Sequence, residues 1–169
     1  MKDSRLIAAN GRVAAASLRG HLQADAFVAG KLMSVIQPVV DLRSSPTGPR
    51  ERQLLRGALL TVFEDRGGWS FVQGLNGYVG YIPSETLGLQ SAPTHMVSTR
   101  ATHAYQGETF KSVDLMGLPF GARVTVLDER QKFFETDVGY ISKSHLCPVD
   151  RLFSDPVTIT QMHLSLIHI

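Results

Sequence analysis

The sequence predicts an all-β protein made of two small five-stranded barrels in tandem behind an N-terminal arm. Two observations lead to this prediction. Residues 57–87 contain short stretches of alternating apolar and polar residues, separated by turn signals, as in an antiparallel meander. Much of this stretch occurs a second time over residues 121–146. A repeated meander indicates two similar small domains rather than one larger domain.

The first copy contains a strong hairpin signal. Asn76-Gly77 separates residues 69–73 from residues 78–82, and both flanking stretches alternate between apolar and polar positions. Tyr78 and Tyr81 lie three residues apart, so their side chains should face opposite sides of the sheet. We expect Tyr81 to point into the barrel and Tyr78 to point outward.

The second copy keeps the order of the first. Gly121 stands for Gly57, and the segment 139–141 stands for residues 80–82. The second copy is five residues shorter, and the missing residues fall at the hairpin tip. Insertions and deletions cost little stability at such tips, so the two copies predict the same fold.

The remaining elements complete each barrel. A strand over residues 33–42, in which Pro38 forces an edge position or a bend, and a polar loop over residues 43–52 precede the first meander. A strand, a polar loop, a three-stranded meander and a terminal turn make a five-stranded barrel of the Src-homology-3-like (SH3-like) type. We expect the following division: an arm over residues 1–34, a first SH3-like domain over 35–88 and a second over 94–150. Within the arm, residues 13–18 form either a short helix or an extended segment.

Composition excludes several classes of function. With 19% charged and 43% hydrophobic residues and a net charge of +2, the chain is typical of a soluble globular protein. Lys and Arg are scattered among acidic residues, so we expect no nucleic-acid partner. No apolar segment is long enough for a signal peptide or a membrane span, which predicts a cytoplasmic location and no membrane partner.

The side chains that could carry chemistry have simpler interpretations. Cys147 is the single cysteine and is expected to have a structural role, because no nucleophile motif surrounds it. The histidines lack metal-ligand spacing, so we predict no metal site and no cofactor. Trp69 could contact a ligand or pack in the barrel. One loop contains Arg43, Arg50, Arg52 and Arg56. Because Asp41 and Glu51 interrupt these arginines and no aromatic stacking ladder accompanies them, a solvated loop is favoured over nucleic-acid binding.

Six motifs together resemble a known family. They are AANGRVA at 8–14, VIQPVVDLR at 35–43, QLLRG at 53–57, GWSFVQ at 68–73, GYVGYIP at 77–83 and THMVSTRATHAY at 94–105. In this order they resemble the N-terminal half of bacterial NlpC-type cell-wall peptidases. These are papain-like cysteine enzymes that carry tandem bacterial SH3-like domains ahead of the catalytic domain.

The resemblance implies that the catalytic domain is missing here. The family's Asp-Cys-Ser-Gly nucleophile motif is absent, so this chain has no catalytic residues and is expected to be inactive alone, whereas its parent would be a cysteine endopeptidase. Residues 155–164 read as the start of the missing peptidase domain, with Asp155 as the N-cap of a helix. Residues 165–169 resemble a translated sequencing-adapter tail and are interpreted as an artefact.

The resemblance also implies a substrate site. In the family, the first SH3-like domain selects peptidoglycan stem peptides of the L-Ala-γ-D-Glu type with a free N-terminal amine, and the family's aromatic and acidic positions match Tyr78 and Glu51. A carboxylate could pair with the ammonium, and a phenol could hydrogen-bond the peptide. The expected function is therefore substrate selection and scaffolding for a peptidase that recycles cell-wall peptides. Two alternatives remain open: a stand-alone SH3-like module that binds cell-wall peptide or a protein partner and, less favoured, a nucleic-acid-binding barrel.

Overall fold

The computed structural model describes residues 3–150 and divides into two compact units. One unit comprises residues 1–54 and 58–90, and the other comprises residues 55–57 and the chain from residue 91 onward. Each unit is described by itself below. The predicted start of a peptidase domain at 155–164 and the predicted tail at 165–169 lie outside the described residues.

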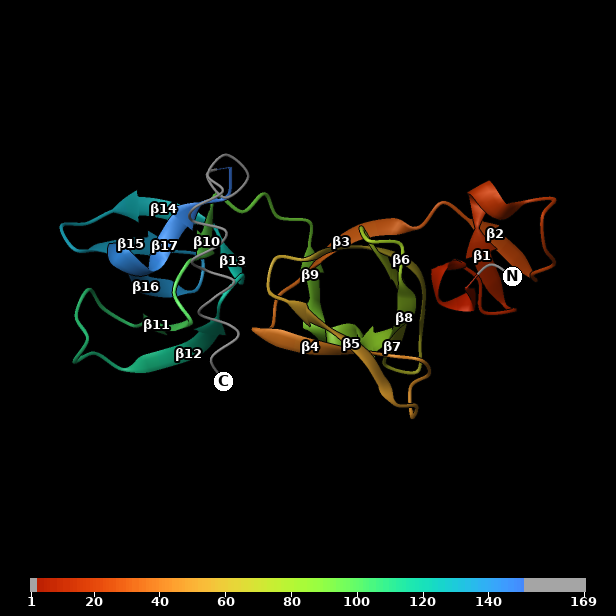
Figure 1. Cartoon of the computed structure of the whole chain (residues 1–169), viewed down its shortest axis with the longest axis horizontal. Coiled ribbons are helices and arrows are strands. Elements are labelled where there is room, and N and C mark those ends of the chain that lie inside the picture. Colours follow the sequence, from red (N-terminus) through yellow and green to blue (C-terminus); the bar gives the residue numbers. More distant parts are fainter. Residues whose placement is uncertain (1–2, 151–169) are drawn as a thin grey trace. The chain divides into compact units, whose positions relative to one another are not determined.

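The first unit contains a seven-stranded sheet whose strands curve around a common centre (Figure 1). Its order in space is β5-β4-β8-β7-β6-β3-β9. The strands are β3 (Lys31–Val35), β4 (Val39–Arg43), β5 (Arg50–Leu55), β6 (Leu59–Arg66), β7 (Trp69–Gly74), β8 (Val79–Pro83) and β9 (Leu87–Leu89), with the 3-10 helix η3 (Ser84–Thr86) before the last strand. The predicted meander corresponds to β6, β7 and β8, which pair as antiparallel neighbours.

The predicted single strand over residues 33–42 is wrong in one respect, because it is interrupted. β3 ends at Val35 and β4 begins at Val39, so Pro38 lies in the break. Proline has no N–H to donate to a strand ladder, which explains why the chain bends there. The predicted polar loop is also shorter than expected, since β5 begins at Arg50.

The barrel interior is filled from alternate positions of its strands. The buried residues are Val35, Val40, Leu42, Leu60, Val72 and Ile82. On β8, Ile82 points inward and is fully buried, whereas Val79 and Tyr81 pack in a separate cluster on the outer face. The prediction that Tyr81 faces the interior and Tyr78 faces outward is therefore wrong. Tyr78 is half-buried and packs partly against the interior cluster.

The arm supplies the reason for this reversal. It contains η1 (Ser4–Leu6), β1 (Val13–Ala15), η2 (Ala16–Leu18) and β2 (Ala26–Val28), with β1 and β2 paired in parallel. Its Ala8 and Ala15 pack against Phe63 and Phe71 on the outer face of the barrel. The arm thereby buries apolar side chains on that face. The alternation of residues along a strand does not show which of its two faces is the barrel interior when both faces are covered. Residues 13–18 are a strand followed by a 3-10 turn.

The second unit repeats the strand order of the first. Its strands are β10 (His95–Val97), β11 (Ala101–Tyr105), β12 (Asp114–Pro119), β13 (Arg123–Val124), β14 (Val126–Glu129), β15 (Phe133–Thr136), β16 (Gly139–Ser142) and β17 (Leu146–Pro148), with η4 (Lys143–His145) before β17. They form sheets of order β12-β11-β16-β15-β14 and β13-β10-β17. This is the order of the first barrel, with the counterpart of β6 split into β13 and β14. The all-β class with two SH3-like barrels is thus confirmed.

The five-residue difference between the copies lies in one hairpin. Trp69 pairs with Pro83 across β7 and β8, 14 positions later, whereas Phe133 pairs with Ser142 across β15 and β16, nine positions later. The second barrel has its own buried cluster, which includes Val97, Leu118, Val124 and Ile141. Within residues 3–150, no helix is long and apolar enough to cross a membrane.

Candidate functional site

The outer face of the first barrel carries two hollows. The pairing of β4, β7 and β8 determines which side chains lie next to them. Tyr81 of β8 lies opposite Arg43 of β4 on one side and Phe71 of β7 on the other. Pro83, two residues further along β8, lies opposite Trp69. Residues two apart face the same side of a strand, so these side chains share the outer face. The arm covers the Tyr81 and Phe71 part of this face, and the Trp69 and Pro83 part borders a second hollow.

The first hollow, here called the arm pocket, has a volume of about 310 Å³. Residues from both the arm and the barrel line it: Ser4, Arg5, Ala9, Asn10, Ser44, Glu51, Phe71, Val79, Gly80 and Tyr81. Its floor is aromatic, with the Phe71 and Tyr81 ring centroids 5.2 Å apart. The pocket exists only because the arm lies on the barrel face.

Glu64 of β6 holds the arm in place. Its carboxylate accepts two hydrogen bonds from the Arg12 guanidinium, at 2.9 Å from Nε and 2.7 Å from Nη2. Asn10 Nδ2 donates to the same carboxylate at 2.9 Å and lies 3.1 Å from the Tyr81 hydroxyl. The hydrogen bonds from Arg12, with a further contribution from Asn10, hold the pKa of Glu64 below its usual value. This cluster fixes one wall of the arm pocket.

Glu51, predicted as the acid of the substrate site, lines the arm pocket from β5. Its side chain is 31% exposed, and its Oε2 lies 3.8 Å from Nη1 of Arg5. Arg5 is bound more closely by Asp3, with Nη2 to Oδ2 at 2.8 Å. The carboxylate of Glu51 is therefore accessible and only loosely paired, so a better-placed cation could approach it.

Tyr78, predicted as the aromatic of the site, lies beside the arm pocket but does not line it. The guanidinium carbon of Arg52 is 3.4 Å from its ring centroid, and that of Arg5 is 5.9 Å away. Its hydroxyl makes no hydrogen bond to any residue between 3 and 150. The structure thus brings Glu51 and Tyr78 into one neighbourhood through Arg5, without a direct contact between them. Arg5 was not singled out in the sequence, since nothing in the arm's pattern shows which strand it will meet.

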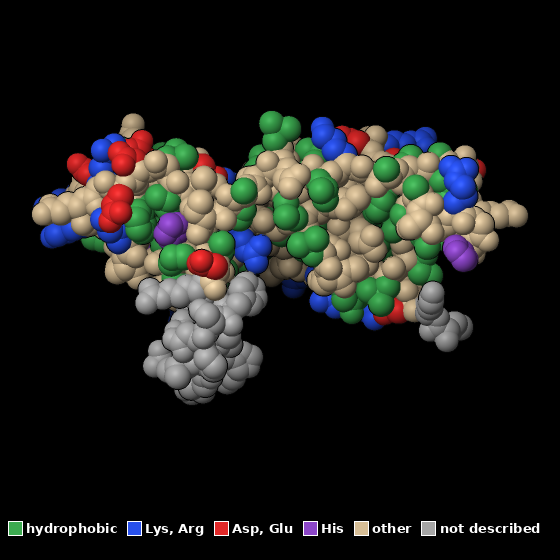
Figure 2. All heavy atoms as spheres, turned by 90° about the horizontal axis from the view of Figure 1, so that it is seen from above, with side chains coloured by type: hydrophobic (Ala, Val, Ile, Leu, Met, Phe, Trp, Pro, Cys, Tyr) green, Lys and Arg blue, Asp and Glu red, His purple; other side chains and the backbone are tan. Residues whose placement is uncertain are grey.

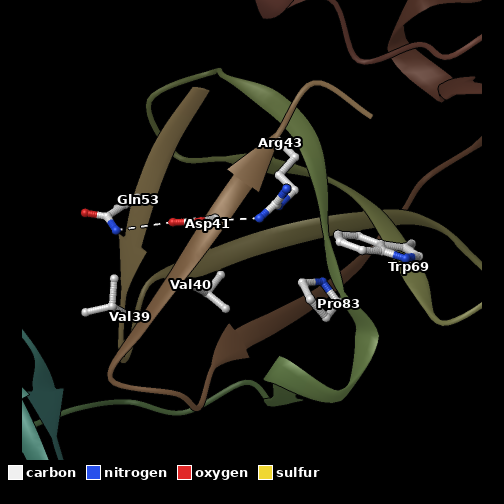
Figure 3. A pocket seen from close by; sticks show the side chains of 7 residues that line it. All are labelled: Val39, Val40, Asp41, Arg43, Gln53, Trp69 and Pro83. Carbon is white, nitrogen blue, oxygen red and sulfur yellow. Dashed lines mark hydrogen bonds and ion pairs between the residues drawn. The ribbon is translucent and has the colours of Figure 1, made fainter. Parts of the chain in front are cut away.

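The second hollow, here called the tryptophan groove, has a volume of about 410 Å³. It is lined by Val39, Val40, Asp41, Arg43, Gln53, Trp69 and Pro83 (Figure 3). In Figure 3, the Trp69 and Pro83 rings lie on one side of β4, and Val39 and Gln53 lie on the other. Trp69 thus borders a hollow and is not a member of the barrel's buried cluster.

The other candidate side chains form no reactive site in the described part of the chain. Cys147 is half-buried in β17. No group of three or more His, Cys, Asp or Glu side chains that could hold a metal ion occurs among residues 3–150. On the face seen in Figure 2, basic and acidic side chains are interspersed, so this face presents no continuous basic surface.

Comparison with known proteins gives a family match and a structural match. Residues 42–87 match the family described as the bacterial dipeptidyl-peptidase SH3 domain. The structure is similar to that of an NlpC/P60 family protein from Bacillus cereus, with a TM-score of 0.58 and 14% identity over 69% of this chain and 56% of that protein. The chain thus spans little more than half the length of that protein. No curated protein sequence matches the chain.

Two proteins of Trichomonas vaginalis also match. NlpC2 has 15% identity and a TM-score of 0.31 over 70% of this chain and 48% of that protein. NlpC1 has 15% identity and a TM-score of 0.34 over 71% of this chain and 46% of that protein. The family match runs from the end of β4 through η3, and the Bacillus cereus structure shares the fold. The resemblance predicted from the six motifs is confirmed at this level: residues 42–87 match the bacterial dipeptidyl-peptidase SH3 domain, and the fold is shared with an NlpC/P60 family protein.

Proposed function

We propose that this chain is the substrate-selecting and scaffolding region of a cysteine peptidase that recycles peptidoglycan by cleaving γ-D-glutamyl stem peptides with a free N-terminus. The observation that carries the proposal is the accessible Glu51 carboxylate in the arm pocket. At about 310 Å³, that pocket lies at the lower end of the range for small-molecule sites. It suits the first two residues of a stem peptide, L-Ala and γ-D-Glu, rather than a long chain.

The charges around the pocket support recognition of an amine. The ammonium of a stem peptide would take the place of Arg5 at Glu51, at a shorter distance than the present 3.8 Å. Arg5 would keep its closer partner Asp3, so the exchange leaves no cation unpaired. The hydroxyl of Tyr78 would donate to a peptide carbonyl, and its ring would limit the length of chain that fits on the amine side.

A binding experiment tests the proposal on this chain. We expect L-Ala-γ-D-Glu to shift the amide NMR signals around Glu51 and Gly80, and N-acetyl-L-Ala-γ-D-Glu to bind about tenfold more weakly, because one lost charge-assisted pair is worth about 1.4 kcal/mol. Glu51→Gln should remove this preference for the free amine.

Glu85→Gln is the matched control, because Glu85 is an exposed acid of the same barrel in η3 and lines neither hollow. It should bind both peptides like the unmodified chain. Equal affinity of the unmodified chain for the free and acetylated peptides would overturn the amine pocket. A stand-alone binding module, the alternative function, predicts the same preference. An NlpC-type peptidase domain joined to this chain distinguishes the two functions. A substrate-selecting region predicts that the joined protein hydrolyses the free-amine peptide and not the acetylated peptide, whereas a stand-alone binding module predicts no such hydrolysis.

A further inference from the structure

Both asparagines of the chain are followed by glycine, at Asn10-Gly11 and Asn76-Gly77. This dipeptide is prone to deamidation, because glycine has no side chain to hinder attack by its backbone nitrogen on the preceding side-chain amide. The glycine nitrogen loses its proton and bonds to Cγ of the asparagine, the bond between Cγ and Nδ2 breaks, and ammonia leaves. Water then opens the cyclic imide to aspartate or isoaspartate. The two sites differ in what holds the amide.

The Asn10 amide is bound through both of its polar atoms while the arm lies on the barrel. Nδ2 donates to Glu64 Oε2 at 2.9 Å and to the Tyr81 hydroxyl at 3.1 Å. Oδ1 accepts from the backbone N–H groups of Arg12, at 3.1 Å, and Val13, at 2.9 Å. Closure of the imide ring turns the side chain away from these partners and expels Nδ2 from its two acceptors. The docked arm therefore protects this amide.

The Asn76 amide is held much less firmly, at the exposed tip of the hairpin between β7 and β8. Its Oδ1 accepts one hydrogen bond, from the backbone N–H of Tyr78 at 3.2 Å, and its Nδ2 donates to no residue between 3 and 150. The Gly77 N–H donates to the Gly74 carbonyl at 2.9 Å. Hydrogen bonds in an exposed turn open readily to water. Asn76 therefore provides an internal reference for the rate at Asn10.

Deamidation of Asn10 would disrupt the contact that holds the arm. Aspartate has no side-chain N–H to donate, so a carboxylate oxygen would lie where Nδ2 now lies, 2.9 Å from a carboxylate oxygen of Glu64. Two negative charges at such a distance repel each other. Isoaspartate also inserts a methylene group into the backbone, where the Asn10 N–H donates to the Val13 carbonyl at 3.0 Å. Both products therefore weaken docking of the arm.

We propose that Asn10 is a latent deamidation site whose modification releases the arm from the first barrel. The docked arm keeps the amide intact, and deamidation during a transient opening makes redocking unfavourable, so the change runs in one direction. Release uncovers Phe63 and Phe71 and dismantles the arm pocket, which Asn10 lines. The inference is independent of peptide binding, because it concerns the rate of a chemical change and the position of the arm.

Incubation of the purified chain at mildly alkaline pH measures both rates in one molecule. Peptide mapping by mass spectrometry gives the fraction of aspartate and isoaspartate at each asparagine over time. We expect Asn10 to react at least about tenfold more slowly than Asn76, since the loss of one hydrogen bond to a charged group shifts an opening equilibrium by about that factor. In the chain unfolded by urea, the two rates should become similar. Equal rates in the folded chain would overturn the protection of Asn10.

Two variants test whether the arm contact sets the rate at Asn10. Tyr81→Phe removes one acceptor of Asn10 Nδ2 and keeps the aromatic ring. Arg12→Gln removes the guanidinium hydrogen bonds to Glu64 and keeps both side-chain acceptors of the Asn10 amide. Each variant should speed deamidation of Asn10 about three- to tenfold and leave the rate at Asn76 unchanged.

Glu135→Gln is the matched control for these variants. Glu135 is an acid paired with Arg130 in the second barrel, so its replacement should alter neither deamidation rate. Trp69 is the only tryptophan in the chain, and its fluorescence emission shows whether the first barrel remains folded in each variant.

Asn10→Asp tests the effect of the modification directly. A dye that fluoresces on exposed apolar surface should bind this variant more strongly than the unmodified chain, because Phe63 and Phe71 are uncovered. Asn76→Asp is the matched control, since it carries the same substitution in the exposed hairpin, and its dye binding should not change. The proposal is overturned if Asn10→Asp binds no more dye than Asn76→Asp. It is also overturned if neither Tyr81→Phe nor Arg12→Gln changes the rate at Asn10.

Discussion

Glu64 is the side chain through which the first barrel holds the arm. It receives both Arg12 hydrogen bonds and the Asn10 amide, and it is largely shielded, with a side chain 15% exposed against 44% for Arg12. Because one partner is well exposed, solvent screening reduces the value of the pair. The contact is nevertheless the polar link between residues more than 50 positions apart in the sequence.

A double-mutant cycle measures this link. Arg12→Gln and Glu64→Gln should each lower the free energy of unfolding of the first unit, with a coupling of about 0.5–1 kcal/mol between them. Urea unfolding followed by Trp69 fluorescence gives the four values. The pair Arg130 and Glu135 in the second barrel, with Nη2 to Oε2 at 2.6 Å, serves as the control, and its removal should not alter the Trp69 transition. Strictly additive losses for Arg12 and Glu64 would contradict the assignment.

The lowered pKa of Glu64 makes the same contact sensitive to pH. A carboxyl whose pKa is lower in the folded state adds stability above its unfolded pKa, and this stability is lost as the pH falls through the folded pKa. The stability difference between the unmodified chain and Glu64→Gln should therefore shrink between about pH 5 and pH 3. Urea unfolding at a series of pH values measures it. A stability difference that stays constant over this range would contradict the link between protonation of Glu64 and its contact with the arm.

At this scale, one of the two residues that the family motif predicted for substrate binding lies in the arm pocket. Glu51 lines the pocket, and Tyr78 lies near it in an orientation that was predicted wrongly. Arg5 and Asn10 were missed, because their role depends on where the arm settles on the barrel. The proposed binding roles of Glu51 and Tyr78 stay predictions until peptide binding is measured.

Two equivalent glycines lie where a neighbouring strand leaves no room for a side chain. A Cβ at Gly80 of β8 would lie 2.6 Å from the carbonyl oxygen of Arg43 and 2.8 Å from Leu42 Cγ. A Cβ at Gly139 of β16 would lie 2.6 Å from the carbonyl oxygen of Tyr105. Gly139 also has a φ of +125°, whereas Gly80 does not have a positive φ. The repeat conserves a glycine where β8 approaches β4 and where β16 approaches β11.

Alanine at Gly80 tests this close approach. Gly80→Ala should lower the free energy of unfolding by about 2 kcal/mol or more, because the methyl group meets backbone that cannot move aside without breaking the strand pairing. Thermal unfolding monitored by circular dichroism measures the effect. Gly117→Ala is the control, since its new Cβ would meet nothing closer than 3.9 Å and its φ is not positive. A loss at Gly80 no larger than at Gly117 would contradict the geometry.

Some elements could be predicted from the sequence and others could not. The Asn76-Gly77 hairpin and the meander follow from local chemistry, which a sequence displays directly. The break at Pro38 was visible as a bend but not as the end of a strand. The parallel pairing of β1 with β2 was not predicted, because it joins two three-residue strands across ten intervening residues with no periodic signal.

Within residues 3–150, the interior clusters of the two barrels share no residue. Ile82 in the first and Ile141 in the second are both fully buried and occupy matching positions of the repeat. Replacing either by valine removes one buried methylene and should cost about 1 kcal/mol. Hydrogen exchange should show Ile82→Val reducing the protection of first-barrel amides and Ile141→Val that of second-barrel amides. Equal loss across residues 31–148 for either variant would contradict two separate cores.

The tandem organisation could be predicted because the sequence contains the meander pattern twice, over residues 57–87 and 121–146. Two imperfect copies of one meander fix the fold class more firmly than any single stretch could, since the residues common to both are the ones that the fold requires. The covering of the barrel's outer face could not be predicted in this way. The arm occurs once, and its alanine-rich sequence carries little information about the surface that it meets.

That covering has a practical consequence for anyone who prepares the first barrel as a separate fragment. A fragment that begins at residue 31, where β3 starts, would contain every strand of the seven-stranded sheet and look complete. It would nevertheless expose Phe63 and Phe71, which are only 9% and 3% exposed beneath the arm. Newly uncovered aromatic surface of this kind promotes self-association. The smallest well-behaved fragment therefore starts before Ala8, not at the first strand of the barrel.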